Sequence, residues 1–347
     1  MKLMKTTEAV GQVLCHDITQ IIPGVKKDAV FRKGHIITKE DIPVLLSVGK
    51  DTIYIWENDE TMMHENEAAQ VLYSMCACHA ASKMHPSSVK EGKIEVIADC
   101  DGLLKVDSEK LKKVNSFGEM MIAARHGNTT VKKGDKLAGT RIIPLVIKKD
   151  KLKEASNICE DGPILDIKPF VVRKAAIITT GNEVYHGRIQ DAFTPVIEKK
   201  IAEFGAQMMF HEVFDDDDKK ITDGCLRAIE AGAEIVFCTG GMSVDPDDKT
   251  PLAIKNTGAR IVSYGSPVLP GAMFLLSYYD AGDRLVPICG LPGCAMYNKR
   301  TIFDIVLPRL MARDMIYADE LAGLGEGGLC LNCDVCTFPN CGFGKGF

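Results

Sequence analysis

The feature that most restricts the fold of this chain is a regular alternation of strand-like and helix-like segments after residue 170. The run VVRKAAIITTG predicts a strand that ends in glycine. Further strands are expected at 207–214, 233–238, 273–279 and 284–289, the last two as a hairpin, and helices at 194–204, 218–231, 250–258 and 294–313. Such alternation is typical of a mostly parallel sheet with helices on both faces. The expected fold class is therefore α/β, a three-layer, mostly parallel sheet.

The part of the chain before residue 170 has a different character. Residues 1–57 mix short strand-like runs with one helix-like stretch, KEDIPVLLSVG, and residues 92–148 are rich in strands separated by glycine turns. We therefore expect an N-terminal α+β, β-rich region over 1–150 and a connector over 151–169. An α/β domain follows over 170–315, and a cysteine-rich tail over 316–347 closes the chain.

Composition narrows the class of protein. Of 347 residues, 46% are hydrophobic and 26% charged, which is ordinary for a globular protein. The net charge of −5 gives no basic field that would attract nucleic acid or an anionic membrane. No run approaches ~18 apolar residues, so no membrane span is expected. The start, MKLMKTTEAVGQVL, lacks the apolar core of a signal peptide, and we expect a cytoplasmic protein whose scattered cysteines are reduced.

Three strands of the α/β region end in turns that contain glycine: IITTGNE (177–183), FCTGGMS (237–243) and PICGLPG (287–293). Glycine allows positive φ and lets a ligand approach the backbone closely. The carboxyl ends of parallel strands share one edge of a sheet, where ligands bind near a switch in strand order. Turn amides there can hold phosphate. The three turns favour an anionic ligand over the alternative that glycine serves only the turns.

Two acidic groups accompany these turns. Asp245, Asp247 and Asp248 follow the second turn, and Asp215–Asp218 follow another strand of the same region. Because carboxylate and phosphate repel each other, acids beside a phosphate site usually hold Mg²⁺. Two alternatives remain: Asp215–Asp218 is a solvated loop that caps the next helix, or Asp248 or Thr250 merely caps the helix at 250.

Four motifs together point to a family. The stretches TTGNEVYHGRIQDAF, DDDD, TGGMSVDPDDKTP and GLPG occur in an order and spacing that resembles the molybdopterin-binding domain of molybdenum cofactor biosynthesis proteins, over residues 172–312. More loosely, AVGQVLCHDIT, FRKGHII and KKGDKLAGTRIIP are similar to the N-terminal part of molybdopterin molybdotransferases. Because only some 35 residues follow the last expected helix, we expect the C-terminal β-barrel domain of those enzymes to be missing.

The resemblance assigns expected roles to particular residues. It implies that the pterin's phosphate end is held by Thr239, Gly240, Gly241 and Ser243. Asp248 and Thr250 would lie beside the metal or the reacting phosphate. As candidate catalytic carboxylates we take Asp248 and the pair after the second strand, Asp215 and Asp216, together with Mg²⁺. The remaining cofactor-binding candidates are Thr180, Gly181 and Glu183 in the first turn and Gly290, Pro292 and Gly293 in the third.

The function implied by the resemblance is binding of molybdopterin or its adenylate, with Mg²⁺-dependent insertion of molybdenum from molybdate. Two alternatives stay open. The chain could be a non-catalytic molybdopterin carrier that serves a molybdoenzyme, or an enzyme acting on another phosphorylated, nucleotide-like ligand. Relatives of this domain tend to form dimers or trimers, so the resemblance also implies a homo-oligomer.

The chain ends GEGGLCLNCDVCTFPNCGFGKGF, in which Cys330, Cys333, Cys336 and Cys341 have the spacing C-x2-C-x2-C-x4-C. Four thiolates within twelve residues can bind a zinc ion or an iron–sulfur cluster, and the spacing is close to a ferredoxin run without equalling it. The sequence favours a metal here and leaves zinc and iron–sulfur open. The alternatives are a flexible reduced tail or cysteines exposed for thiol exchange.

Overall fold

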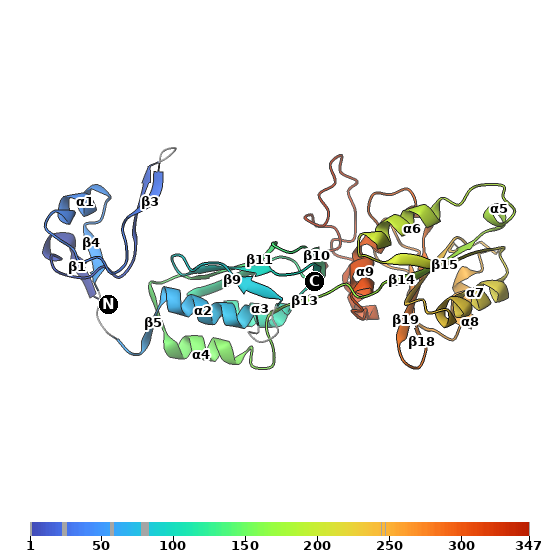
Figure 1. Ribbon diagram of the computed structural model, residues 1–347, viewed down its shortest axis with the longest axis horizontal. Coiled ribbons are helices and arrows are strands. Elements are labelled where there is room, and N and C mark those ends of the chain that lie inside the picture. Colours follow the sequence, from blue (N-terminus) through green and yellow to red (C-terminus); the bar gives the residue numbers. More distant parts are fainter. Residues whose placement is uncertain are drawn as a thin grey trace. The chain divides into compact units, whose positions relative to one another are not determined.

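The structure, a computed structural model, describes residues 2–22, 26–55, 59–77, 83–243, 245–246 and 248–346. The chain divides into two compact units (Figure 1). The first comprises residues 1–99, 106–125 and 134–166, and the second comprises 100–105, 126–133 and 167–347. The stretch expected as a connector, 151–169, contains most of helix α4 (Lys149–Asn157) and strand β13 (Leu165–Lys168).

The first unit is an α+β structure. It begins with two antiparallel pairs, β1 (Lys2–Lys5) with β4 (Thr52–Ile55) and β2 (Ile18–Ile22) with β3 (Lys26–Phe31), joined by the 3-10 turn η1 (Thr6–Glu8) and helix α1 (Asp41–Ser47). Strand β5 (Met62–His64) pairs with β12 (Val146–Lys148). An antiparallel sheet has the order β6 (Met84–Pro86), β7 (Lys93–Ala98), β11 (Lys136–Ile142) and β9 (Met120–Ala124). Helices α2 (Glu65–Cys76), α3 (Ser108–Asn115) and α4 complete the unit.

The second unit is built on a six-stranded sheet. Its strand order is β15 (Gln207–Phe214), β14 (Lys174–Thr180), β16 (Ile235–Thr239), β19 (Leu285–Leu291), β18 (Leu275–Asp280) and β17 (Arg260–Tyr264). The first four strands are parallel, and β18 and β17 are antiparallel to their neighbours. The expected hairpin at 273–289 is the β18–β19 pair. A small sheet of β10 (Thr129–Val131), β8 (Gly102–Val106) and β13 belongs with this unit.

Helices cover both faces of the six-stranded sheet (Figure 1). Because side chains alternate along a strand, Ala175 and Ile177 pack with α6 (Phe193–Ala202) and α9 (Ile302–Met311), whereas Ala176 and Ile178 pack with α7 (Asp218–Glu230) and α8 (Thr250–Asn256). These strands are apolar on both faces, as expected of a parallel sheet between two helical layers. The three-layer α/β class expected from the sequence is confirmed.

Two expectations for the end of the chain were wrong. The helix expected at 294–313 is shorter: residues 293–295 form the 3-10 turn η2 (Gly293–Ala295), and α9 begins at Ile302. The Thr301 side chain accepts from the Phe303 N–H, and the Asp304 carboxylate accepts from the Thr301 N–H, a capping box that fixes this start. The region expected as a tail, which includes α10 (Ala318–Gly323), packs into the core through Ile316, Leu321 and Phe343.

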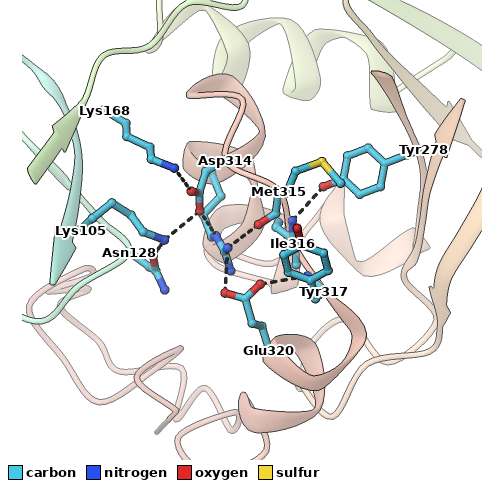
Figure 2. Close-up of polar contacts among 10 residues, drawn as sticks. Lys105, Asn128, Lys168, Tyr278, Asp314, Met315, Ile316, Tyr317 and Glu320 are labelled. Atoms are coloured by element: carbon cyan, nitrogen blue, oxygen red, sulfur yellow. Dashed lines mark hydrogen bonds and ion pairs between the residues drawn. The ribbon is translucent and has the colours of Figure 1, made fainter. Parts of the chain in front are cut away.

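A buried carboxylate ties this C-terminal region to the small sheet. Asp314, just after α9, forms ion pairs with Lys105 Nζ of β8 at 2.9 Å and Lys168 Nζ of β13 at 2.5 Å (Figure 2). It also pairs with Arg309 Nε at 2.6 Å. Burial alone would raise its pKa, but Lys168, Lys105 and Arg309 outweigh this effect and lower the pKa of Asp314 to about 2. The carboxylate is therefore ionised and serves as a structural hub of the second unit.

No helix among the residues that the structure describes is long and apolar enough to cross a membrane.

Candidate ligand site

The strand order changes direction between β14 and β16. From β14 the chain passes through α6 to β15 on one side, and then through α7 to β16 on the other side of β14. In doubly wound sheets, the crevice outside the carboxyl ends of two such strands is the usual place for a ligand. In this chain those ends are Thr180 and Thr239, which begin the first two glycine turns.

Three buried threonines fix the two strand ends to each other. Thr180 Oγ1 donates to the Thr239 carbonyl at 3.1 Å and lies 3.0 Å from Thr250 Oγ1, at the start of α8. The Thr250 N–H in turn donates to the Gly241 carbonyl at 3.2 Å. The exposed fractions of Thr180, Thr239 and Thr250 are 3%, 0% and 0%. Thr180 and Thr250, expected to touch the ligand, lie beneath the loop and hold it in position. Thr239 contributes only its carbonyl, and its buried hydroxyl has no partner among the described residues.

The loop after β16 needs its two glycines because its backbone lies very close to Thr180 and Thr250. Gly240 and Gly241 have φ values of +80° and +53°. A Cβ on Gly240 would lie 2.1 Å from the Thr180 carbonyl oxygen, and one on Gly241 would lie 2.8 Å from Thr250 Oγ1. No side chain fits there without moving the backbone, so main chain forms the wall at this strand end.

A cavity of about 570 Å³ opens at this position, a size within the usual range for small-molecule sites. Its lining brings together six of the residues that the sequence analysis singled out: Gly240, Gly241, Ser243, Asp248, Pro292 and Gly293. The second and third glycine turns thus meet at one cavity. Gly290, another glycine that the sequence analysis expected at the ligand, lies inside β19. Its missing side chain leaves room for Met242 rather than for a ligand.

Asp248 is the only charged side chain among the described residues that line the cavity. Its Oδ2 atom is buried and has no hydrogen-bond partner in the part of the chain that the structure describes. Burial, and then the charge of Asp248, raise the pKa of Tyr264, whose hydroxyl donates to the Met242 carbonyl at 3.3 Å. Among the described residues, no side chain accepts from the first turn of α8, so Asp248 does not cap this helix. Asp247 lies outside the described residues.

The acidic run after β15 has mainly local contacts. Asp215 pairs with Lys220 at 2.7 Å, and Asp216 accepts from the Asn182 N–H at 3.1 Å, at the start of α5 (Asn182–Tyr185). Asp217 accepts from two N–H groups in the first turn of α7, so the capping alternative holds for it. Glu183 folds back over Gly181. Gly181, Glu183, Asp215 and Asp216 thus lie at the ends of β14 and β15, outside the lining of the cavity.

Sequence reasoning missed one wall of the cavity. Residues 269–273 line it, as do Phe193, Tyr297 and Asn298. Gly271 has a φ of +133°, and a Cβ there would lie 2.4 Å from Ile302 Cγ2, so the segment lies directly against the start of α9. The Pro270-Gly271 dipeptide before a predicted strand is a turn signal that could have pointed to this wall.

The four cysteines of the C-terminal segment line a second cavity, of about 240 Å³. Cys330 and Cys341 are half-buried against the core, and Cys333 and Cys336 are exposed. The Phe338 N–H, and then the Arg300 guanidinium, lower the pKa of the Cys336 thiol. Among the described residues, no three histidine, cysteine or acidic side chains converge on a single point as ligands of one metal ion.

Comparison with known proteins agrees with the motifs. Residues 176–312 match the family described as "Probable molybdopterin binding domain", and residues 3–57 match a domain of unknown function. The chain carries a molybdenum cofactor biosynthesis domain.

A molybdopterin molybdenumtransferase of Staphylococcus epidermidis is 26% identical over 159 residues, which cover 43% of this chain and 38% of that enzyme. A Bacillus velezensis protein named as competence-damage inducible is 29% identical over 90 residues, 26% of this chain and 21% of that protein.

The chain thus spans between about a fifth and two fifths of the length of these relatives. Among solved structures, the tungsten cofactor synthesizing protein MoaB of Pyrococcus furiosus is 18% identical with a TM-score of 0.31, covering 41% of this chain and 89% of that one. The Mog protein of Mycobacterium ulcerans is 18% identical with a TM-score of 0.32, covering 43% and 99%.

Proposed function

We propose that the cavity at the β14–β16 switch binds the phosphorylated end of molybdopterin or its adenylate, and that the chain inserts molybdenum from molybdate. The observation that carries the proposal is the meeting of the glycine loop after β16 and the Leu-Pro-Gly turn after β19 at one 570 Å³ cavity. Both segments belong to the matched region at 176–312. Main chain without side chains suits the close approach of a phosphate.

The unpartnered carboxylate of Asp248 fits a divalent cation. A lone carboxylate beside a phosphate would repel it, and Mg²⁺ is commonly held by one or two carboxylates together with substrate phosphates. When bound, the ion would neutralise charge on the phosphate that reacts. Asp248 would hold it, while Gly240 and Gly241 would fix the phosphate, so most of the catalysis would come from positioning and charge stabilisation. Asp215 and Asp216, engaged with Lys220 and α5, would support the neighbouring turn.

A release assay tests the enzymatic proposal. Purified protein is given adenylated molybdopterin, molybdate and Mg²⁺, and AMP is measured. The wild type should release AMP as the phosphate anhydride is cleaved and molybdenum is taken up, and Asp248→Asn should lower the rate at least tenfold. Asp245→Asn is the matched control, since this exposed carboxylate lies in the same loop and should leave the rate unchanged. Equal rates for wild type and Asp248→Asn would refute the role of Asp248.

A second candidate is a carrier that binds the pterin without turnover and delivers it to a molybdoenzyme. Tight pterin binding with no AMP release would select this function. The third candidate is an enzyme on another phosphorylated, nucleotide-like ligand, because a wall of main chain suits any phosphate. A thermal-shift panel would select it, since a bound ligand raises the melting temperature of the folded state.

Two further expectations are carried as proposals. The many buried free thiols, such as Cys225, Cys238 and Cys289, suit a reducing compartment, and we place the protein in the cytoplasm. We also propose a homo-oligomer, which light scattering of the purified protein would test.

A further inference from the structure

The cysteine segment is a closed and anchored loop. The Cys330 N–H donates to the Leu269 carbonyl at 2.8 Å, and the Leu269 N–H donates to the Gly328 carbonyl at 2.8 Å. At the other end, the Gly344 N–H donates to the Gly327 carbonyl at 3.0 Å. Phe343 is 5% exposed and belongs to the core. The two ends of the loop are therefore joined at its base by main-chain hydrogen bonds.

Glycine makes this closure possible. A Cβ on Gly344 would lie 2.7 Å from Ile305, and one on Gly327 would lie 2.7 Å from the Gly342 carbonyl oxygen. Both glycines have positive φ, +78° at Gly327 and +73° at Gly344. The glycines around the cysteines thus let the two ends of the loop cross at close range, which directs the segment between them around one space.

All four thiols border that space. The cavity of about 240 Å³ is lined by Cys330, Cys333, Cys336 and Cys341. Two of them are half-buried at its inner side and two are exposed, so the cavity has an inner and an outer pair of sulfur atoms. Its walls are otherwise mostly apolar, and include Leu329 and Phe338.

The size of the space distinguishes between occupants. A zinc ion with four thiolates has Zn–S bonds of about 2.3 Å, which places neighbouring sulfurs only about 3.8 Å apart and leaves no cavity between them. A polynuclear iron–sulfur cluster fills a space between its four cysteines, and its ligands occur in runs such as C-x2-C-x2-C. The 240 Å³ cavity, which ten other residues line besides the four thiols, has room for the cluster.

Charge at the rim suits the same occupant. Arg300 and Lys299 both line the cavity. Lys299 Nζ donates to the Asp334 carbonyl at 3.3 Å. The Arg300 guanidinium lies 5.0 Å from the centre of the Phe338 ring and also pairs with Asp304 at 2.9 Å, which offsets part of its charge. A cluster with four thiolate ligands carries net negative charge, which two neighbouring cations would offset.

We propose that Cys330, Cys333, Cys336 and Cys341 bind a four-iron, four-sulfide cluster. On binding, each of the four thiols gives its proton to solvent and each thiolate sulfur forms one bond to iron. The apolar walls and the two cations would shield and balance the cluster, both of which tune its potential. This site is separate from the cavity at the β14–β16 switch and does not depend on the function proposed for it.

The test is elemental analysis of the full chain purified without oxygen. We expect about four iron atoms and four acid-labile sulfides per chain, with visible absorption and an electron paramagnetic resonance signal after reduction. Cys333→Ser and Cys336→Ser should each lose at least half of the iron and sulfide. Both positions are exposed, so the fold should remain, which a thermal melt of the metal-free proteins would check. Cys159→Ser, a half-buried thiol of the first unit, is the control and should retain full content.

Several results would overturn the proposal. One zinc ion per chain with no labile sulfide would assign the segment to a single-ion site. Iron and sulfide that persist in Cys333→Ser would show that these thiols are not ligands. A protein with no metal and a disulfide between two of the four cysteines would assign the loop to thiol exchange. Pterin binding is measured separately, so failure of either proposal is recognisable on its own.

Discussion

Replacing Asp314 with asparagine should unfold the second unit at a markedly lower temperature. The substitution keeps the shape of the side chain and removes its charge. Lys105, Lys168 and Arg309 would then face one another without the carboxylate that they share. Asp314 is 5% exposed and Arg309 is also buried, so this pair is little screened by solvent, whereas Lys105 and Lys168 are partly exposed.

The magnitude follows from the structure in two ways. The pKa of Asp314 falls from 3.8 to about 2, and at 1.36 kcal/mol for each pKa unit this is worth about 2 kcal/mol. Removing one partner of a buried ion pair costs about 3–5 kcal/mol. The lower end applies here, because Arg309 stays buried whereas Lys168 and Lys105 are 41% and 27% exposed. We expect a loss of about 3 kcal/mol, which for a unit of this size lowers the melting temperature by roughly 6–12 °C.

The pH dependence gives the sharper assay. Because the pKa is lower in the folded state, the stabilisation is complete above the ordinary pKa of about 3.9 and is lost as pH falls toward about 2. Thermal melts of wild type and Asp314→Asn should differ most above pH 5 and should converge between pH 4 and pH 2. Asp319→Asn, an exposed carboxylate nearby, is the control. Equal melting temperatures at pH 7, or a difference that does not shrink in acid, would refute the reasoning.

Three further results are expected. Gly240→Ala should destabilise the protein by about 3 kcal/mol or more in chemical denaturation, because the new Cβ would overlap the Thr180 carbonyl. The control is Gly232→Ala, which has a similar φ but open space around it and should cost only about 1–2 kcal/mol. Thr180→Val should cost about 1–2 kcal/mol in the same assay, because it leaves buried polar atoms without a partner. Since burial raises the pKa of Cys289, this thiol should resist iodoacetamide at pH 8 in metal-free protein, whereas exposed Cys333 should be alkylated, as read by mass spectrometry.

Much of the second unit could be predicted from sequence because its signals are local. The strand at 207–214 was placed correctly. The strand expected over VVRKAAIITTG ends within one residue of Thr180 but begins three residues later than expected, at Lys174. The order of strands could not be predicted, because pairing depends on contacts between distant segments. The start of α9 was missed because the sequence analysis did not recognise the capping box at Thr301, which begins the helix at Ile302.

The candidate site was predictable in place but not in detail. Three glycine turns pointed to one sheet edge, and two of them meet at the cavity. The sequence could not show that Thr180 and Thr250 point into the protein and hydrogen-bond to each other. Polar side chains at a strand end can bind a ligand or form a buried hydrogen bond equally well. The wall at 269–273 comes from outside the motifs, and only tertiary packing brings it to the site.

The most direct test of the account is a calorimetric titration of molybdopterin into wild type, Gly293→Leu and Gly139→Leu. Gly293 lines the cavity and Gly139 lies on β11 of the first unit, and at both positions a Cβ would meet nothing within 4 Å. Both variants should therefore fold, but only the leucine at position 293 should fill the cavity. We expect Gly293→Leu to weaken binding at least tenfold and Gly139→Leu to bind like wild type. Equal affinity in all three proteins would contradict a pterin site at this cavity.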